Sequence, residues 1–308
     1  MPQPMKQMKT NIMNPMKTRA IIIQALLATC FSACTQDDIR LDGNGKDEPL
    51  VISSAQMTTF STRAAIIQEG RLLGGEIGVT VEGNGARYSC ENAKWTYSSD
   101  NDCWTSESTV LYEGPCKQNL YAYWPYSDNF VENQGIYITL PERQSTKNLS
   151  DYDYLCSDYL EVDTNPIDIE MHHAFPKVRV NITKNGTSLT NESISNVKLL
   201  KVGNQGYWNP WGKTYATEFS NVTMADVGDN SYEALVFPSD LKEFTVEVTI
   251  SNGRVFSTLV KLPFPMNANY KFNINLIIAG KNLIVVDNVS VTDWVDNPLE
   301  NGTISEIE

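Results

Sequence analysis

The chain has 308 residues, 41% of them apolar and 20% charged, and its formal net charge is −13. Four of the 24 basic residues and none of the 37 acidic residues precede Cys34, so 20 basic and 37 acidic residues follow, a formal charge of −17. Nucleic acid and anionic membrane surfaces both require a basic face, so neither is expected as a partner. The 275 residues after Ala33 are enough for one large domain or two domains of ordinary size.

The first 33 residues have the pattern of an export signal. A basic head, "MKTR" from Met16 to Arg19, is followed by the 14-residue apolar run "AIIIQALLATCFSA", which ends at Ala33. A membrane-spanning helix needs about 20 such residues, so this run is too short to span a bilayer and is typical of a secretory signal peptide. Residues 1–15 lengthen the head, and Met16 is an alternative start.

The residues "FSAC" at the end of this run resemble a bacterial lipobox, in which a signal peptidase cuts before a lipid-modified cysteine. The resemblance implies that Cys34 is the first mature residue and carries the lipid, so that outer-membrane lipid is a partner. Asp37 and Asp38 resemble the surface-export signal of lipoproteins in the Bacteroidetes. An ordinary signal peptide with an incidental cysteine is the alternative. Residues 34–50 are otherwise polar and contain glycine, which is typical of a flexible tether.

From Val51 onward the chain has the patterns of β-strands and turns. Stretches such as "GGEIGVTVEG", "PKVRVNITKNG" and "FTVEVTISNGRVFSTLVKLP" are rich in Val, Ile, Thr and Phe, and several alternate apolar and polar residues. Asn252-Gly253 lies between two such runs and predicts a hairpin turn. Many short strands and no long amphipathic helix predict an all-β protein built from β-sandwiches.

Two sandwich domains fit this length better than one. Asn165-Pro166 interrupts a strand pattern, so we place the boundary there, with a first domain over residues 51–165 and a second over residues 166–308. The predicted order is therefore a signal peptide over residues 1–33, a tether over residues 34–50, and two β-sandwich domains.

Residues that could carry catalysis or bind a metal are scarce. The only two histidines, His172 and His173, are adjacent, and neighbouring strand residues point to opposite faces, so they cannot hold one metal together. We expect one imidazole in the core and one facing solvent. Asp151 and Asp153 are one pair among many carboxylates, and a solvated loop explains them better than acid–base chemistry. We therefore predict no catalytic residue, no metal, no cofactor and no enzyme activity.

Four cysteines follow Cys34 in the chain: Cys90, Cys103, Cys116 and Cys156. An exported protein lies in a compartment that permits disulfides, so these four are disulfide candidates, and four cysteines allow three pairings. Buried thiols are an equally good interpretation.

The stretch "GYWNPWGKTY" gathers Tyr207, Trp208, Trp211 and Tyr215. When buried, such side chains fill a sandwich core, which is the commoner case; when exposed, they form a platform on which sugar rings stack. Tyr207, Trp208 and Trp211 are therefore candidate ligand-binding residues. A surface glycan-binding lipoprotein is the alternative function.

Stretches spread along the chain resemble the fimbrillin-like (Mfa-like) surface lipoproteins and pilins of the Bacteroidetes. "MTTFSTRAA" resembles the family's first strand, "DIEMHHAFPKVRVNI" the strand that opens its second half, and "LIVVDNVSVTDW" its closing strand with Trp294. The resemblance covers nearly the whole mature chain and implies two tandem transthyretin-like β-sandwich domains. It also implies a fimbrium (pilus) at the cell outer membrane and a role in adhesion. The implied partners are other pilus subunits and a surface glycan or protein.

In polymerising members of that family an Arg-specific protease removes the first strand, and the groove left behind accepts a strand from the next subunit. The resemblance places this cut after Arg63, with Arg71 as the second choice; a solvent-exposed arginine at a strand end is the alternative for Arg63. After Trp294 only 14 residues follow, and only Ile304 and Ile307 alternate in a way that suits a donor strand. This departure favours a tip, accessory or non-polymerising role over a repeating stalk.

Overall fold

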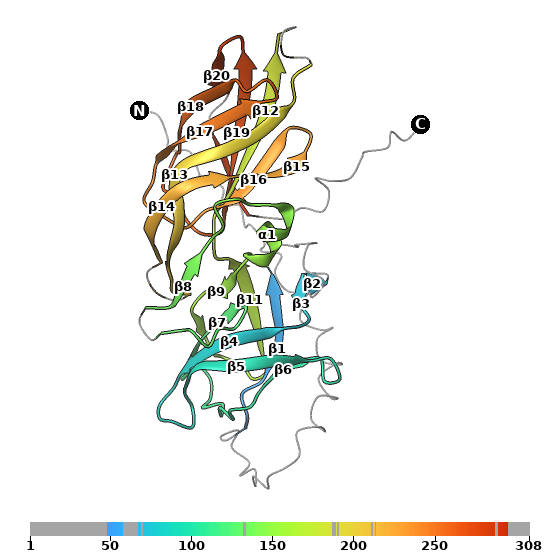
Figure 1. The fold of residues 1–308 in the computed structure, drawn as a ribbon. Helices are drawn as coiled ribbons and strands as arrows, with labels where there is room; N and C mark the ends of the chain where they lie inside the picture. Colours follow the sequence, from blue (N-terminus) through green and yellow to red (C-terminus); the bar gives the residue numbers. More distant parts are fainter. Residues whose placement is uncertain are drawn as a thin grey trace, which may run out of the picture. The chain divides into compact units, whose positions relative to one another are not determined.

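The computed structural model describes residues 48–57, 67–68, 70–131, 134–186, 189, 191–210, 212, 214–286 and 289–294. The chain divides into two units, residues 1–40 and residues 41–308, and all described residues belong to the second. They form β-strands joined by turns and one short helix, α1 (Thr146–Asp151), as Figure 1 shows. Across the described ranges, no helix is long and apolar enough to cross a membrane. The predicted all-β fold is confirmed.

The first sheet has the strand order β11-β9-β7-β4-β5-β6-β1-β3-β2, with β10 paired to β7. β1 also pairs with β11. The hydrogen-bonded strands from β11 through β7 and β5 to β1 therefore form a closed ring. The bounds of its strands are β1 (Ile52–Met57), β2 (Ile67–Gln68), β3 (Arg71–Leu72), β4 (Glu76–Glu82), β5 (Cys90–Ser98), β6 (Cys103–Ser106), β7 (Asn119–Trp124), β9 (Leu155–Ser157), β10 (Leu160–Glu161) and β11 (Ile167–His173).

Strands of this first sheet send apolar side chains into a common core. Ile77 and Val79 of β4 and Leu120 of β7 are fully buried, and they belong to one hydrophobic cluster with side chains of β1, β5, β6, β9 and β11. Gly78 lies against the ring of Tyr123, where an added Cβ would come within 2.1 Å of a ring carbon. Only glycine fits there, so β4 and β7 approach closely at this point.

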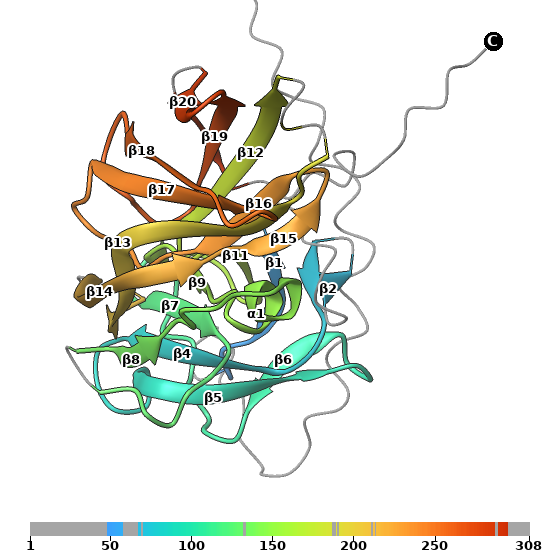
Figure 2. The ribbon, with the colours of Figure 1, turned by 45° about the horizontal axis from the view of Figure 1, so that its top comes forward.

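The other described strands form two further sheets. One has the order β15-β16-β12-β19-β20, with β21 paired to β19, and the other has the order β14-β13-β17-β18, with β8 paired to β13. Figure 2 shows β13 and β14 running side by side, with β17 on the far side of β13. The bounds are β8 (Ile136–Thr139), β12 (Lys177–Asn185), β13 (Ile194–Trp208), β14 (Tyr215–Thr223), β15 (Ala225–Gly228), β16 (Ser231–Leu235), β17 (Glu243–Ile250), β18 (Val255–Lys261), β19 (Tyr270–Ala279), β20 (Asn282–Val285) and β21 (Ser290–Asp293).

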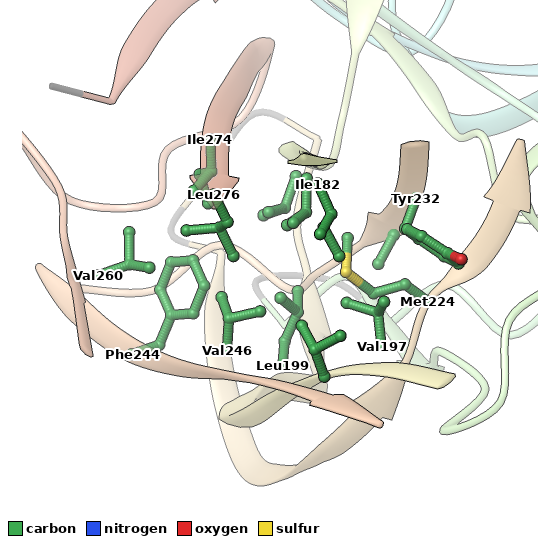
Figure 3. Packing of buried hydrophobic residues seen from close by; sticks show 14 of the residues in the cluster. Ile182, Val197, Leu199, Met224, Tyr232, Phe244, Val246, Val260, Ile274 and Leu276 are labelled. Carbon is green, nitrogen blue, oxygen red and sulfur yellow. The ribbon is translucent and has the colours of Figure 1, made fainter. Parts of the chain in front are cut away.

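These two sheets pack face to face around a second hydrophobic cluster. Figure 3 shows Ile274 and Leu276 of β19 opposite Phe244 and Val246 of β17, all of them buried. In β17 every second side chain is buried, because alternate residues of a strand face the same side. The predicted β-sandwich is therefore present in this half of the chain.

The hairpin predicted at Asn252-Gly253 is confirmed. β17 and β18 pair in antiparallel register on either side of it, from Glu243 opposite Lys261 to Thr249 opposite Val255. Gly253 has φ +83° and donates its N–H to the carbonyl of Ile250 at 2.9 Å. Glycine adopts this backbone conformation without steric cost.

The predicted domain boundary after Asn165 lies before the last strand of the first sheet. β11 follows that residue, yet it pairs with β1 and β9. β8 precedes it, yet it pairs with β13. A third buried cluster joins Tyr123 of β7, Ile138 of β8, Trp208 of β13 and Phe175, which follows β11. The segment from β8 to β11 therefore contributes to the sheets of both halves of the chain.

Candidate assembly site around the first strand

β1 is the strand on which the candidate site depends. It runs parallel to β11 with five registered residue pairs. On its other side it makes one registered pair with β3, Gln56 with Arg71, and one with β6, Ile52 with Trp104. β1 is therefore held along its length by one neighbour, and near its two ends by the others.

Polar side chains fix the position of β1 against the start of β11. Ser53 Oγ and Ser54 Oγ both donate to Asp168 Oδ1, at 2.8 and 2.5 Å. Just before the strand, the backbone N–H of Val51 donates to Asn165 Oδ1 at 2.8 Å. A hydrogen bond of this kind contributes about 1 kcal/mol net, so these contacts set the register without making the strand irremovable.

Apolar side chains of β1 fill the first core. Ile52 and Ala55 are almost fully buried, and Met57 is 6% exposed. Leu50, just before the strand, is buried as well. Burying each of the three large side chains contributes about 1.5–3 kcal/mol, so apolar packing holds β1 more strongly than its polar contacts do.

Loss of β1 would open a groove in the first sheet. The N–H and C=O groups of β11 that now pair with β1 would lose their partners, and the apolar cluster beneath would be exposed. A strand that supplies both backbone pairing and apolar side chains satisfies such a groove. The site is therefore chemically suited to exchange one strand for another.

The two arginines considered for a proteolytic cut are in different situations. Arg63 lies outside the described residues. Arg71 lies in β3, where its backbone is paired and its guanidinium contacts the Asp102 carboxylate at 2.9 Å. Tyr97 Oη donates to the same carboxylate at 2.6 Å, and these two contacts hold the pKa of Asp102 below its ordinary value. A protease needs an extended, accessible segment, which Arg71 in β3 does not offer.

Trp294, next to the end of β21, is fixed by contacts with the end of β11. Its ring is 1% exposed and stacks on His173, with the ring centroids 3.7 Å apart. The ammonium of Lys177 lies 4.1 Å from the Trp294 ring centroid, in a cation–π contact. His173 Nδ1 is 2.6 Å from Asp153 Oδ1. β11 thus pairs with β1 and, at its C-terminal end, anchors the closing tryptophan.

The two histidines point to opposite sides of β11, as predicted. His173 is fully buried, whereas His172 is partly exposed and its Nε2 lies 3.4 Å from Cys156 Sγ. Burial lowers the pKa of His172, with the carboxylate of Asp158 acting in the opposite direction. His172 is therefore more enclosed than the solvent-facing imidazole expected from the sequence.

The carboxylates of Asp151 and Asp153 make structural contacts. Asp151 accepts a bond from Lys147 Nζ at 2.5 Å on the surface of α1, and Asp153 holds His173. Among the described residues, no group of three or more His, Cys, Asp or Glu side chains is placed to bind a metal ion.

All four candidate cysteines are thiols in the structure. Cys90 begins β5, and Cys103 pairs with Ser98 at the other end of the same strand, so roughly 26 Å of extended chain separates them. A disulfide requires Cα atoms less than about 7 Å apart, which excludes the Cys90–Cys103 pairing in this fold. Cys116 is exposed and Cys156 is buried. Disulfide formation through other pairings stays a prediction.

The fold separates the residues of the aromatic stretch, for which core packing is the commoner expectation and a ligand platform the alternative. Trp208 is 2% exposed and packs edge-on against Tyr154 and Tyr123, with ring centroids 5.1 and 5.7 Å away. It is a core residue and presents no face to a ligand. Tyr207 points to the other side of β13 and is partly exposed. Trp211 and the candidate lipid site Cys34 lie outside the described residues.

The sequence gives no sign of the contacts made by three residues. Asp168 and Asn165 accept hydrogen bonds from β1 and from the residue before it, and Tyr137 lies beside Tyr207. Asp168 is one exposed polar residue in the alternation of β11, and nothing local identifies Ser53 and Ser54 as its partners. These contacts join residues more than 60 positions apart, so a local sequence pattern carries no signal for them.

Comparison with known proteins identifies the family. A family model described as fimbrillin-like matches residues 62–294, more than half of the chain. This chain therefore belongs to the fimbrillin-like family, a family of structural fimbrial subunits. Among curated proteins, none matches the chain in sequence.

Solved structures show the same fold at low sequence identity. A candidate cell adhesion protein from Bacteroides ovatus ATCC 8483 is similar with 17% identity and a TM-score of 0.62, over 82% of this chain and 99% of that chain. One from Bacteroides uniformis ATCC 8492 has 17% identity and a TM-score of 0.57, over 82% and 100%. The tip fimbrial protein Mfa3 of Porphyromonas gingivalis, with a C-terminal truncation, has 12% identity and a TM-score of 0.54, over 80% and 100%.

Proposed function

We propose that this chain is a lipid-anchored fimbrial subunit that assembles by strand exchange after proteolytic removal of its first strand. The position of β1 carries the proposal: its apolar side chains fill the core, while only β11 pairs with it along its length. Membership of the fimbrillin-like family supports a place in the fimbrium at the cell surface and a part in adhesion. The similarity to a tip fimbrial protein makes the tip one of the places that the subunit could occupy.

The incoming strand must reproduce what β1 supplies. Side chains at the positions of Ile52, Ala55 and Met57 face the core, and the residue at the middle position, Ala55, is small. The strand must also run parallel to β11 to use the same backbone groups. An exchanged strand is therefore selected by its pattern of large and small apolar residues, as in other forms of strand addition.

The cut is tested by treating the purified precursor with an Arg-specific protease. We expect one early product that begins at Ala64 and a folded core that resists further digestion. Arg63→Lys, which keeps the charge, should abolish this product. A matched variant, Asp102→Asn, removes the carboxylate that holds the Arg71 side chain but leaves the Arg71 backbone paired in β3, so it should add no second cut. Early cutting elsewhere, or digestion without a stable core, would contradict the proposal.

Strand uptake is tested on the cut protein. A labelled peptide with the sequence of residues 50–57 should exchange into the cut chain and not into the precursor, because β1 can leave the groove only after it is cut from the chain. A peptide in which Ile52 and Met57 are replaced by Asp is the control, since charged side chains cannot enter the apolar cluster. Equal binding of both peptides would show that no groove of this kind forms.

Lipid anchoring is tested in cells with Cys34→Ala. We expect this variant to leave the membrane fraction or to accumulate unprocessed, while Cys30→Ala, four residues earlier, remains anchored. Unchanged anchoring of the Cys34 variant would remove the lipoprotein part of the proposal and would leave strand exchange untouched.

A further inference from the structure

Three tyrosines from three different strands meet on one face of the sheet that contains β13. Tyr207 of β13 is the registered partner of Tyr137 in β8 and of Tyr215 in β14. The ring centroids of Tyr137 and Tyr207 lie 5.0 Å apart, and those of Tyr207 and Tyr215 lie 5.8 Å apart. Opposite residues of paired strands point to the same face, so the three rings form a continuous row across the strands.

This row remains accessible. Tyr137 is 48% exposed and Tyr215 is 41% exposed, and both are among the most exposed large aromatic side chains of the described residues. Single exposed apolar residues are ordinary on protein surfaces. Three adjacent tyrosines in register are a different case, because together they present a continuous aromatic surface with hydroxyl groups at its edge.

A second row of polar side chains lies next to the tyrosines and is held in place by mutual contacts. Gln205, two residues before Tyr207 on β13, accepts hydrogen bonds from Tyr137 Oη and Thr139 Oγ1, both at 3.2 Å. Its Nε2 donates to Glu218 Oε2 at 2.9 Å. A carboxamide has two donor hydrogens and two acceptor lone pairs, so this network fixes the amide in one orientation.

We propose that this tyrosine face, made of Tyr137, Tyr207, Tyr215, Thr139, Gln205 and Glu218, binds a neutral glycan. A sugar ring has an apolar C–H face, which stacks on aromatic rings, and a rim of hydroxyl groups, which bond to amide, hydroxyl and carboxylate groups. The face supplies both kinds of group in adjacent rows. Because the polar row is already ordered, little conformational entropy is lost when a ligand binds.

Charge decides the class of glycan. Glu218 is the one formally charged group of the tyrosine face, and the chain as a whole carries a formal net charge of −13. Uronic and sialic acids would be repelled, whereas neutral hexoses are not. None of β8, β13 and β14 pairs with β1, so the inference goes beyond strand exchange and does not depend on it.

The probe is a set of soluble neutral polysaccharides, a β-glucan, a mannan and a galactan, each cast into a native gel, with polygalacturonate as the acidic counterpart. We expect the uncut protein to be retarded by at least one neutral polysaccharide and not by polygalacturonate. Tyr137→Ser with Tyr215→Ser should weaken the retardation at least tenfold. Tyr137→Phe with Tyr215→Phe keeps the rings and should retain most of it, because stacking carries the affinity.

Tyr159→Ser is the matched control. Tyr159 is 53% exposed and packs edge-on against Tyr121 of β7, with ring centroids 4.7 Å apart, so its aromatic contact is with the first sheet and not with the tyrosine face. Its replacement should leave retardation unchanged. All variants should show the wild-type melting temperature within a few degrees, since the replaced side chains are at the surface.

Three results would overturn the inference. The wild type could be retarded by none of the neutral polysaccharides. The Ser double variant could be retarded as strongly as the wild type while remaining folded. The tyrosine face could instead be required for binding a second fimbrial subunit with no polysaccharide bound, which would make it a protein interface. Loss of the Arg63 cut has no bearing on any of these results, so the two proposals fail separately.

Discussion

β1 and β12 both run parallel to a later strand, yet the sheets hold them very differently. β12 has nine registered pairs with β19, along its whole length, and five with β16, over its first five residues. β1 has five pairs with β11 and single pairs with β3 and β6. Both strands bury apolar side chains almost completely. The two strands are therefore alike in burial and differ in their second neighbour, which pairs with five residues of β12, whereas β1 has only one pair near each end on that side.

This comparison assigns separate roles to the two halves of the chain. In the second half, β12 lies between two neighbours in its sheet. The apolar side chains of that sheet pack against those of β17 in the facing sheet, as Figure 3 shows. In the first half, β1 pairs with β11, β6 and β3. Removing it would leave the strands from β11 to β6 joined in their order and would detach the β2–β3 pair, which joins the sheet only through β1. Under the proposed strand exchange, β1 is the strand that leaves, whereas loss of β12 would separate β16 from β19 in the second sheet.

The largest expected effect comes from a buried charge in each strand. Val180→Asp in β12 places a carboxylate at a fully buried position and should cost about 3–5 kcal/mol or more, unfolding the second half. Ala55→Asp in β1, at an equally buried position, should expel β1 and leave the second half folded. Near-UV circular dichroism and limited proteolysis with mass spectrometry distinguish the two results. Global unfolding by Ala55→Asp would show that β1 is not separable.

A smaller effect is expected from trimming β1. Ile52→Ala removes three carbon atoms from a fully buried side chain and should destabilise the protein by about 2–4 kcal/mol. Because these contacts hold β1, the loss should appear first as faster cutting after Arg63 and only later as unfolding in urea. Gln56→Ala, an exposed position on the same strand, is the control. Parallel changes in cutting and in global unfolding would indicate that β1 and the rest of the chain unfold together.

Asp168→Ala should have a still smaller effect. It removes the acceptor of the Ser53 and Ser54 hydroxyl groups, which should cost about 1–2 kcal/mol because the carboxylate is exposed at one side. Combining it with Ser54→Ala should add little, since both changes remove the same contact. The free energies of unfolding of the single and double variants, measured in urea, check this. Full additivity would mean that the contact is not formed.

The rate at which the Cys156 and Cys116 thiols are chemically labelled can be measured without a substitution that changes the stability of the protein. Burial raises the pKa of Cys156 to about 12, and a hydrogen bond to Glu161 is the main cause that raises the pKa of exposed Cys116 to about 11. Labelling requires the thiolate, so both should react slowly at pH 8 and faster as the pH rises toward these values.

The variant Glu161→Gln should lower the pKa of Cys116 and speed its reaction with iodoacetamide, leaving Cys156 unaffected. Cys156 pairs with His172 across β9 and β11, so removal of β1 should speed the labelling of Cys156 selectively. Rates for each cysteine can be followed by mass spectrometry of digested samples. Equal acceleration of both thiols after removal of β1 would indicate general loosening rather than a local opening beside β11.

Several features of the fold could be predicted because their signals are local. The alternation of β17 and the Asn252-Gly253 turn predict a hairpin, and the structure has it. The adjacency of His172 and His173 in a strand places them on opposite faces, again as found. The resemblance to fimbrillin-like proteins is confirmed by the match over residues 62–294. Each of these inferences needs only residues that are close in the sequence, or a pattern shared by a family.

Other features could not be predicted, because they depend on contacts between distant residues. Trp208 and Tyr207 are neighbours in one aromatic stretch, but strand alternation buries the first and exposes the second. The partner that completes the tyrosine face, Tyr137, is 70 positions away and joins it only because β8 pairs with β13. The sequence shows that aromatic residues gather there, and the pairing of strands decides which of them can meet a ligand.

The sequence by itself determines that this chain is an all-β, acidic protein of the fimbrillin-like family with an export signal pattern at its start. Strand alternation and turn residues are sufficient for the all-β class, the composition for the acidic charge, and the resemblance of stretches along the chain for the family. Only the tertiary structure decides that β1 has one neighbour along its length, whereas β12 has one along its length and a second over five residues. That difference arises from pairing between distant segments, whose free energy depends on the whole sheet and on no single stretch of the chain.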